Sequence, residues 1–177
     1  MSVLLRYFMI VVACFCLLMG MQLPNLTDQY AKRVDASLRE VTLNLQPFLI
    51  VANVNTGGDI EALIALHRQS SVAAFKAEAD AIERIYRRKQ RLESEHKALQ
   101  THLPGRLWHL LMRADAELRE QTLLQYNATV PLTQEALISG GVVALLMLLL
   151  LEGVMALGRR LNTIVTRWIN HRWHGAL

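Results

Sequence analysis

The chain of 177 residues has only two cysteines, Cys14 and Cys16, and both lie inside an apolar run near the N-terminus. Side chains two residues apart on a helix point in roughly opposite directions, so this pair forms neither a disulfide nor a shared metal site. Acidic residues are scarce near the ends, where only Glu135 and Glu152 lie outside the middle of the chain. No alternating run is long enough for a strand, so the sequence predicts an all-α protein.

The excess of positive charge is confined to the two ends. Residues 24–134 contain 14 Lys and Arg against 13 Asp and Glu, whereas the whole chain has a formal net charge of +4. The other basic residues flank apolar segments, which indicates a lipid bilayer rather than a nucleic acid as the partner. Acidic residues are also interspersed among the arginines of residues 84–95, so this charge run is interpreted as a solvated helix face.

Two apolar segments are predicted to be transmembrane helices, residues 1–23 and residues 135–157. In the first, about 21 consecutive residues cover roughly 31 Å, which is enough for the hydrocarbon core of a bilayer. The second contains Val142 to Leu151 without a polar side chain, and Thr133 is placed to cap its first turn.

A cleaved leader is the alternative for the first segment. Leu18-Met19-Gly20 lacks the first small residue of a signal-peptidase site. Val11-Val12-Ala13-Cys14 resembles a lipoprotein signal box, but the apolar stretch before it is only about seven residues long. An uncleaved transmembrane helix is therefore the preferred interpretation.

Arginines follow the second apolar segment: Arg159, Arg160, Arg167 and Arg172. By the positive-inside rule they place the C-terminus in the cytoplasm, and two spans then place the N-terminus there as well. The central domain, residues 24–134, is expected on the periplasmic side. Residues 158–177 combine these arginines with Trp168 and Trp173, and they predict an amphipathic helix lying in the cytoplasmic membrane interface.

Helical periodicity dominates the central domain. One apolar stripe predicts a helix of about 27 residues with a kink near Pro47: Leu26, Tyr30, Val34, Leu38, Val41, Leu45, Phe48 and Ala52. A second stripe predicts another long helix that ends at Pro104-Gly105: Phe75, Ala79, Ile82, Tyr86, Leu92, Leu99 and Leu103. With two shorter helices, over about 106–112 and 115–127, these form an antiparallel helical bundle.

A turn is predicted at Thr56-Gly57-Gly58-Asp59, between the two stripes. The glycines supply positive φ angles, and Asp59 caps a short helix that ends near Ser70. A ligand-binding loop is the alternative, but the segment lacks the lysine and the spacing of a phosphate loop.

No candidate catalytic, cofactor-binding or metal-ligating set emerges from the sequence. His96, His102 and His109 have spacings of six and seven residues across a Pro-Gly break, which match no metal site. The serines lack the glycine frame of a hydrolase nucleophile. We therefore expect a protein without a cofactor that is not an enzyme.

Each apolar segment has small residues along one face: Ala13, Cys16 and Gly20 in the first, and Ala136, Gly140 and Ala144 in the second. Small residues let helices approach closely in lipid, so these faces are predicted to contact the other span or a neighbouring subunit. Glu152 continues the second face. Its carboxylate either reaches towards the membrane surface, makes a buried contact across a helix interface or, as a third alternative, transfers protons.

An ordered set of motifs resembles one bacterial family. The set comprises Gln22-Leu23-Pro24, Asp28-Gln29-Tyr30, Gly57-Gly58-Asp59, Glu61-Ala62-Leu63-Ile64 with His67 and Ser70, and Val130-Pro131-Leu132-Thr133. Together these motifs resemble the proteobacterial two-span membrane proteins grouped as domain of unknown function 2937. The resemblance implies a bacterial inner-membrane location, and it supplies no activity, cofactor or catalytic residue.

The expected function is that of an inner-membrane assembly or scaffold subunit, acting as a homo-oligomer or within a larger membrane complex. The alternative is a periplasmic sensor or regulator that acts through a partner protein, because chemoreceptor-type input modules share this layout. The cytoplasmic tail of about 20 residues is too short for an output domain. An envelope enzyme is the third hypothesis.

Overall fold

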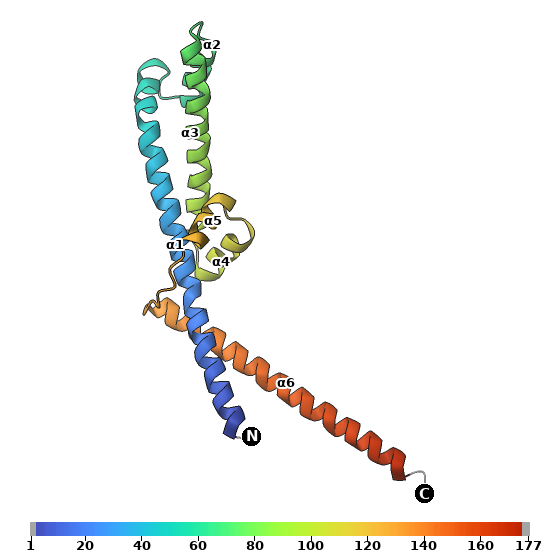
Figure 1. Ribbon diagram of the computed structural model, residues 1–177. Helices are drawn as coiled ribbons and strands as arrows, with labels where there is room; N and C mark the ends of the chain where they lie inside the picture. The colour runs from blue at the N-terminus through green and yellow to red at the C-terminus, as the bar shows by residue number, and fades with distance from the viewer. Residues whose placement is uncertain (1–2, 175–177) are drawn as a thin grey trace. The chain divides into compact units, whose positions relative to one another are not determined.

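The computed structural model describes residues 3–174, with side chains up to residue 158 and that of Arg160. The described residues form six α-helices and contain no strand, which confirms the all-α prediction. The helices are α1 (Val3–Asn55), α2 (Ile60–Gln69), α3 (Ala73–Ala98), α4 (Leu103–Met112), α5 (Ala116–Leu124) and α6 (Gln134–His174) (Figure 1). The chain divides into two compact units: Leu26–Asn127 is one, and the residues before and after it form the other.

Two helices are long and apolar enough to span a membrane. They are α1 and the part of α6 from Gln134 to Gly158, and each reaches a mean hydropathy of 2.3 in its most apolar stretch. Large apolar side chains cover their outer surfaces; Leu4 is 81% exposed and Leu150 is 60% exposed. Lipid would cover such surfaces far more favourably than water does.

Helix α1 continues through Pro24 without a break, so the first apolar segment and the first predicted helix of the central domain form one helix. The helix also stays helical through Pro47 and ends only at Asn55. A proline removes one backbone hydrogen bond, and packing of the neighbouring turns can outweigh that loss.

The core of the Leu26–Asn127 unit consists of two clusters along α1. Residues from α1, α3 with its C-terminal cap, α4 and α5 form the first cluster: Tyr30, Val34, Val41, Leu92, Leu99, Leu110 and Leu118. Residues from α1, α2 and α3 form the second: Leu45, Ala52, Ile60, Leu63, Ile64, Ala79 and Ile82. Both predicted apolar stripes supply most of these side chains. Figure 1 shows α3 running beside the C-terminal half of α1, with α4 and α5 near the C-terminal end of α3.

Two predicted helix ends differ from the structure. Helix α3 stops at Ala98, and Pro104 and Gly105 lie in the first turn of α4 rather than ending α3. Proline is tolerated there because a first-turn N–H has no acceptor within its helix. Helix α5 ends at Leu124, three residues before the expected limit.

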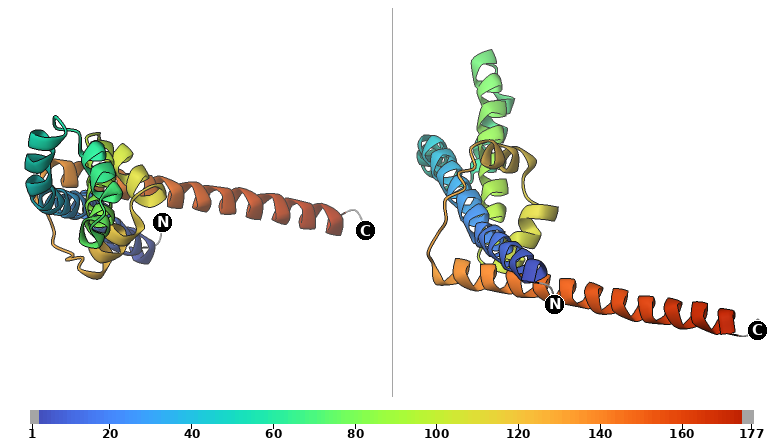
Figure 2. Two further views of the ribbon diagram at one scale, coloured as in Figure 1. Left: turned by 90° about the horizontal axis from the view of Figure 1, so that it is seen from above. Right: turned by 60° about the horizontal axis from the view of Figure 1, so that its bottom comes forward.

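Helix α6 begins where the sequence indicates and extends further than expected. The Ala136 N–H donates to the Thr133 hydroxyl over 3.2 Å, which confirms Thr133 as the N-terminal cap. The helix then continues past residue 157 to His174, so the span and the tail are one uninterrupted helix (Figure 2).

Candidate functional site

The turn between α1 and α2 has the geometry expected from its sequence. Gly57 and Gly58 have φ angles of +64° and +90°, in the region that favours glycine. One carboxylate oxygen of Asp59 accepts hydrogen bonds from the N–H groups of Glu61 at 2.8 Å and Ala62 at 3.1 Å. These contacts cap α2, so the segment serves the local fold.

Substitutions at this turn are expected to act through folding. Gly58→Val should destabilise the Leu26–Asn127 unit by about 1–2 kcal/mol, because φ is positive and the new Cβ would lie 2.8 Å from the Asn53 Oδ1 atom. Asp59→Ala should cost about 1 kcal/mol through the lost cap. Gly57→Asn is the matched control, because nothing lies within 4 Å of a Cβ there and asparagine tolerates positive φ.

Urea unfolding of the full chain in mild detergent, followed by circular dichroism, measures these effects. Normal unfolding midpoints for Gly58→Val and Asp59→Ala, combined with loss of cellular function, would favour the ligand-loop interpretation instead.

A partly buried polar cluster joins three helices in the first core. The Tyr30 hydroxyl of α1 donates to the Glu95 carboxylate of α3 over 2.8 Å, and His109 Nε2 of α4 lies 2.8 Å from the same oxygen. Tyr30 is fully buried, and burial, with the hydrogen bond to Glu95, raises the pKa of its phenol well above the usual range. The cluster therefore fixes the positions of these helices within the unit.

Further polar pairs reinforce the same packing around α1. His96 Nδ1 lies 2.7 Å from Asp35, and Arg106 donates to Asp28 over 2.9 Å. Near the end of the unit, the Gln29 amide donates to the Asn127 carbonyl over 2.8 Å. His96 and His109, whose spacing matches no metal site, thus each face a carboxylate. Among the residues that the structure describes, no group of three or more His, Cys, Asp or Glu is placed to hold a metal ion.

An ion-pair network covers the groove between α2 and α3. Arg68 donates to Asp80 over 2.9 Å and to Glu83 over 2.7 Å, and Arg87 donates to the other Glu83 oxygen over 2.8 Å. The hydrogen bonds from Arg68 and then Arg87 hold the pKa of the Glu83 carboxyl below its usual range. Since every carboxylate of this network faces an arginine, the network stabilises the α2–α3 hairpin.

The strongest candidate site is the contact between the N-terminal part of α1 and α6. A Cβ built on Gly20 would lie 2.8 Å from the Gly140 Cα atom. A Cβ built on Gly140 would lie 2.7 Å from both the Leu17 carbonyl oxygen and the Met21 Cγ atom. Real Cβ atoms do not approach so closely, so each position requires glycine for the helices to touch.

Pro24 adds a polar component to this contact. In a regular helix the N–H of residue 24 would donate to the carbonyl of Gly20, and proline has no N–H to donate. In the structure, the Ser139 hydroxyl of α6 donates to that Gly20 carbonyl. A serine from one helix thus satisfies a backbone acceptor that a proline leaves open in the other, in a region where water is scarce if lipid surrounds it.

The structure brings together most of the small residues singled out in the sequence. Cys16, Gly20, Ala136, Gly140 and Ala144 are buried, and Ala13 is half-buried. Beyond Leu148 the same face of α6 is no longer buried, and Glu152 and Ala156 are exposed.

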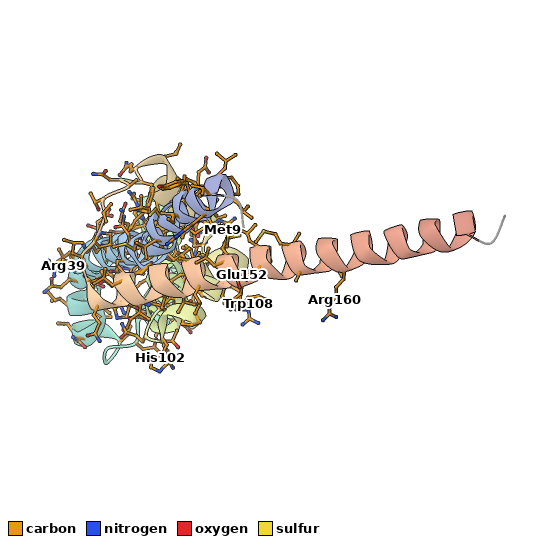
Figure 3. All side chains as sticks on the ribbon, turned by 90° about the horizontal axis from the view of Figure 1, so that it is seen from below. Met9, Arg39, His102, Trp108, Glu152 and Arg160 are labelled. Atoms are coloured by element: carbon orange, nitrogen blue, oxygen red, sulfur yellow. The ribbon has the colours of Figure 1, made fainter. Side chains whose placement is uncertain are left out.

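Figure 3 shows Glu152 and Arg160 on α6, and both side chains are exposed. The other residues of the expected interfacial tail have side chains outside the described residues: Arg159, Arg167, Trp168, Arg172 and Trp173.

Sequence reasoning missed Pro24, Ser139 and Glu95 as partners in these contacts. Pro24 follows Gly20 by four residues, the spacing at which a helical proline leaves a carbonyl without its usual donor. That spacing, together with a serine beside Gly140, is a sequence pattern from which the Ser139 contact could be predicted. The sequence contains no comparable pattern for the Glu95 cluster, because the cluster depends on how three helices pack.

Comparison with known proteins gives one match. The sequence profile of a family described as "Protein of unknown function (DUF2937)" matches residues 4–163. No curated protein and no solved structure matches the chain.

Proposed function

The chain belongs to the DUF2937 family of unknown function, and we propose that it is a structural or assembly subunit of the bacterial inner membrane. In this proposal α1 and α6 cross the bilayer, both ends lie in the cytoplasm, and the helical unit Leu26–Asn127 lies in the periplasm. The unit binds protein partners, which are other copies of the chain or other subunits. It uses neither a cofactor nor a catalytic residue.

The observation that carries this proposal is exposed apolar surface on helix α4 of the Leu26–Asn127 unit. On α4, Trp108 is 60% exposed, and Leu111 and Met112 are exposed beside it. These three residues are called the α4 patch. Exposed aromatic, leucine and methionine side chains gathered on one short helix mark interaction surfaces on folded domains. The α4 patch therefore supports a role in assembly rather than a catalytic role.

Isolation of the tagged full chain from native membranes in polymer-bounded lipid discs tests the assembly role. We expect a complex with fixed stoichiometry, identified by quantitative mass spectrometry. Replacing Trp108 and Leu111 together by serine should reduce recovery of that complex while leaving the unfolding midpoint unchanged. Lys76→Ser, on the exposed surface of α3, is the matched control. A chain recovered only as a monomer of 20.1 kDa would contradict the proposal.

A sensor or regulator acting through a partner protein is the second candidate function. It is favoured by α1, which runs without interruption from the N-terminal apolar segment into the Leu26–Asn127 unit. A signal received by the unit would have a continuous helical connection to the membrane. A small molecule that co-purifies with the chain, and whose removal changes the set of bound proteins, would favour this function over a purely structural one.

A further inference from the structure

The C-terminal half of α1 has apolar residues on two opposite faces. Val41, Leu45 and Ala52 are buried against the rest of the unit. About 180° away around the helix lie Leu43, Pro47, Ile50 and Val54, here called the outer face of α1. Leu43 and Ile50 are each 59% exposed, Val54 is 80% exposed, and Pro47 is exposed as well. An apolar face that stays exposed opposite the buried face marks an interaction surface.

The spacing of the outer face is that of a two-helix contact. Its residues follow one another at intervals of four, three and four positions, which is the alternation that lines the seam of a coiled coil. Towards the N-terminus, the same side of α1 carries the exposed charges Lys32, Arg39 and Glu40. The apolar seam is therefore limited to about 17 Å of helix.

Charge is absent around this seam. No charged residue occurs between Glu40 and Asp59, although charges are frequent on α3. Two membrane-anchored copies of one chain have the same orientation, so their α1 helices meet in parallel. Across the resulting two-fold axis each side chain faces its own copy, and any charge would face a like charge. A charge-free seam suits this arrangement, whereas a different partner would leave flanking charges free to contribute specificity.

The polar residues beside the seam are also self-complementary. Asn44 and Gln46 are exposed and flank Pro47 on either side of the seam. Each amide carries donors and an acceptor, so it can pair with the same residue of a second copy. Pro47 has no N–H for the Leu43 carbonyl, so the seam also offers a backbone acceptor to these amides.

We infer that the outer face of α1 is the contact through which two copies of this chain associate in parallel. The inference rests on the proposed membrane anchoring and names the partner within the proposed assembly role. The seam is too short to bury the surface area that is typical of a stable interface between soluble proteins. Confinement of both copies to one membrane raises their effective concentration and compensates for this limited area.

Single-cysteine crosslinking in native membranes tests the inference, using the full chain with Cys14→Ser and Cys16→Ala. Cysteines at Leu43, Ile50 and Val54 should form disulfide-linked homodimers under mild oxidation. Thr42→Cys and Asn55→Cys are the matched controls, because they are exposed neighbours on α1 that point about 100° away from the seam. The seam positions should crosslink several-fold more than these controls.

A charge placed in the seam provides the second readout. Ile50→Glu should reduce the Leu43→Cys crosslink several-fold, because two carboxylates would meet across the axis, while Asn55→Glu should leave it unchanged. Both residues are exposed, so unfolding midpoints should stay near that of the parent chain.

Equal crosslinking at seam and control positions would overturn the inference. Crosslinks from the seam to a different protein alone would also overturn it, while leaving the assembly role intact. The assembly role fails separately, if the chain is isolated only as a monomer and the α4 patch proves irrelevant to its recovery.

Discussion

Gly140→Leu is expected to separate the N-terminal part of α1 from α6. A Cβ at this position would lie 2.7 Å from the Leu17 carbonyl oxygen, a backbone atom that cannot rotate away. Overpacking in well-packed interiors costs about 1–3 kcal/mol, and a clash with backbone places this variant at the upper end. In lipid no hydrophobic gain opposes separation, since apolar chains contact lipid as favourably as they contact each other.

In the full chain with Cys14→Ser and Cys16→Ala, distances between spin labels on Leu18→Cys and Ile138→Cys, both exposed sites, report this change in lipid nanodiscs. We expect a narrow distribution in the parent chain and a longer, broader one in Gly140→Leu. Gly141→Leu is the matched control, because nothing lies within 4 Å of a Cβ built on that neighbouring glycine. Equal distributions in the two variants would contradict the account of this contact.

Ser139→Ala in the same assay should give a smaller change, because it removes the donor to the Gly20 carbonyl but adds no bulk.

Glu95→Ala should be the most destabilising polar substitution in the Leu26–Asn127 unit. It removes the shared acceptor of the Tyr30 hydroxyl and the partner of His109 Nε2. A buried polar group left without its partner costs about 1–3 kcal/mol, so losing two such contacts should cost about 2–4 kcal/mol. The helices α1, α3 and α4 lose their common polar contact together.

Denaturant unfolding of the full chain measures the loss. Glu95→Gln should be milder, because its amide oxygen still accepts from Tyr30. Glu93→Ala is the control: this exposed residue pairs with Lys89 on the helix surface, where such pairs contribute about 0.3–0.5 kcal/mol. A Glu95→Ala unfolding midpoint within error of that control would show that the cluster does not stabilise the packing.

The sequence predicts local helical features well where one side chain determines them. Asp59 and Thr133 cap the helices that their positions indicate, since capping needs only an acceptor next to an open helix end. The two apolar stripes also predict the buried face of α1 and of α3. Periodicity identifies such faces because it depends on one helix alone.

Prolines mark the points where prediction failed. The sequence predicts a helix end at Pro104-Gly105, but both residues lie in the first turn of α4, and α1 runs through Pro24 without a break. Whether a proline interrupts a helix depends on what satisfies the carbonyl it leaves open. For Pro24 that donor is Ser139, 115 positions away in the sequence, and only the packing of α1 on α6 brings it there.

The candidate site also has features that the sequence predicts and features that depend on packing. The small residues of both apolar segments predict that close helix approach is feasible, and Gly20 and Gly140 do lie against one another. The partner of Glu95 and the outer face of α1 depend on how α1, α3 and α4 pack. The predicted stripe already places Leu43, Ile50 and Val54 opposite the core, but only the structure shows that these residues are exposed.

The labelling of engineered cysteines in intact spheroplasts tests the central claim most directly, namely that two membrane spans hold the helical unit on the periplasmic side. Ser71 and Ser94 are exposed in the Leu26–Asn127 unit, and Thr166 lies in the tail. A membrane-impermeant maleimide should label Ser71→Cys and Ser94→Cys, while Thr166→Cys should react only after the membrane is disrupted. Labelling of Thr166→Cys in intact spheroplasts, with Ser71→Cys and Ser94→Cys protected, would contradict the account.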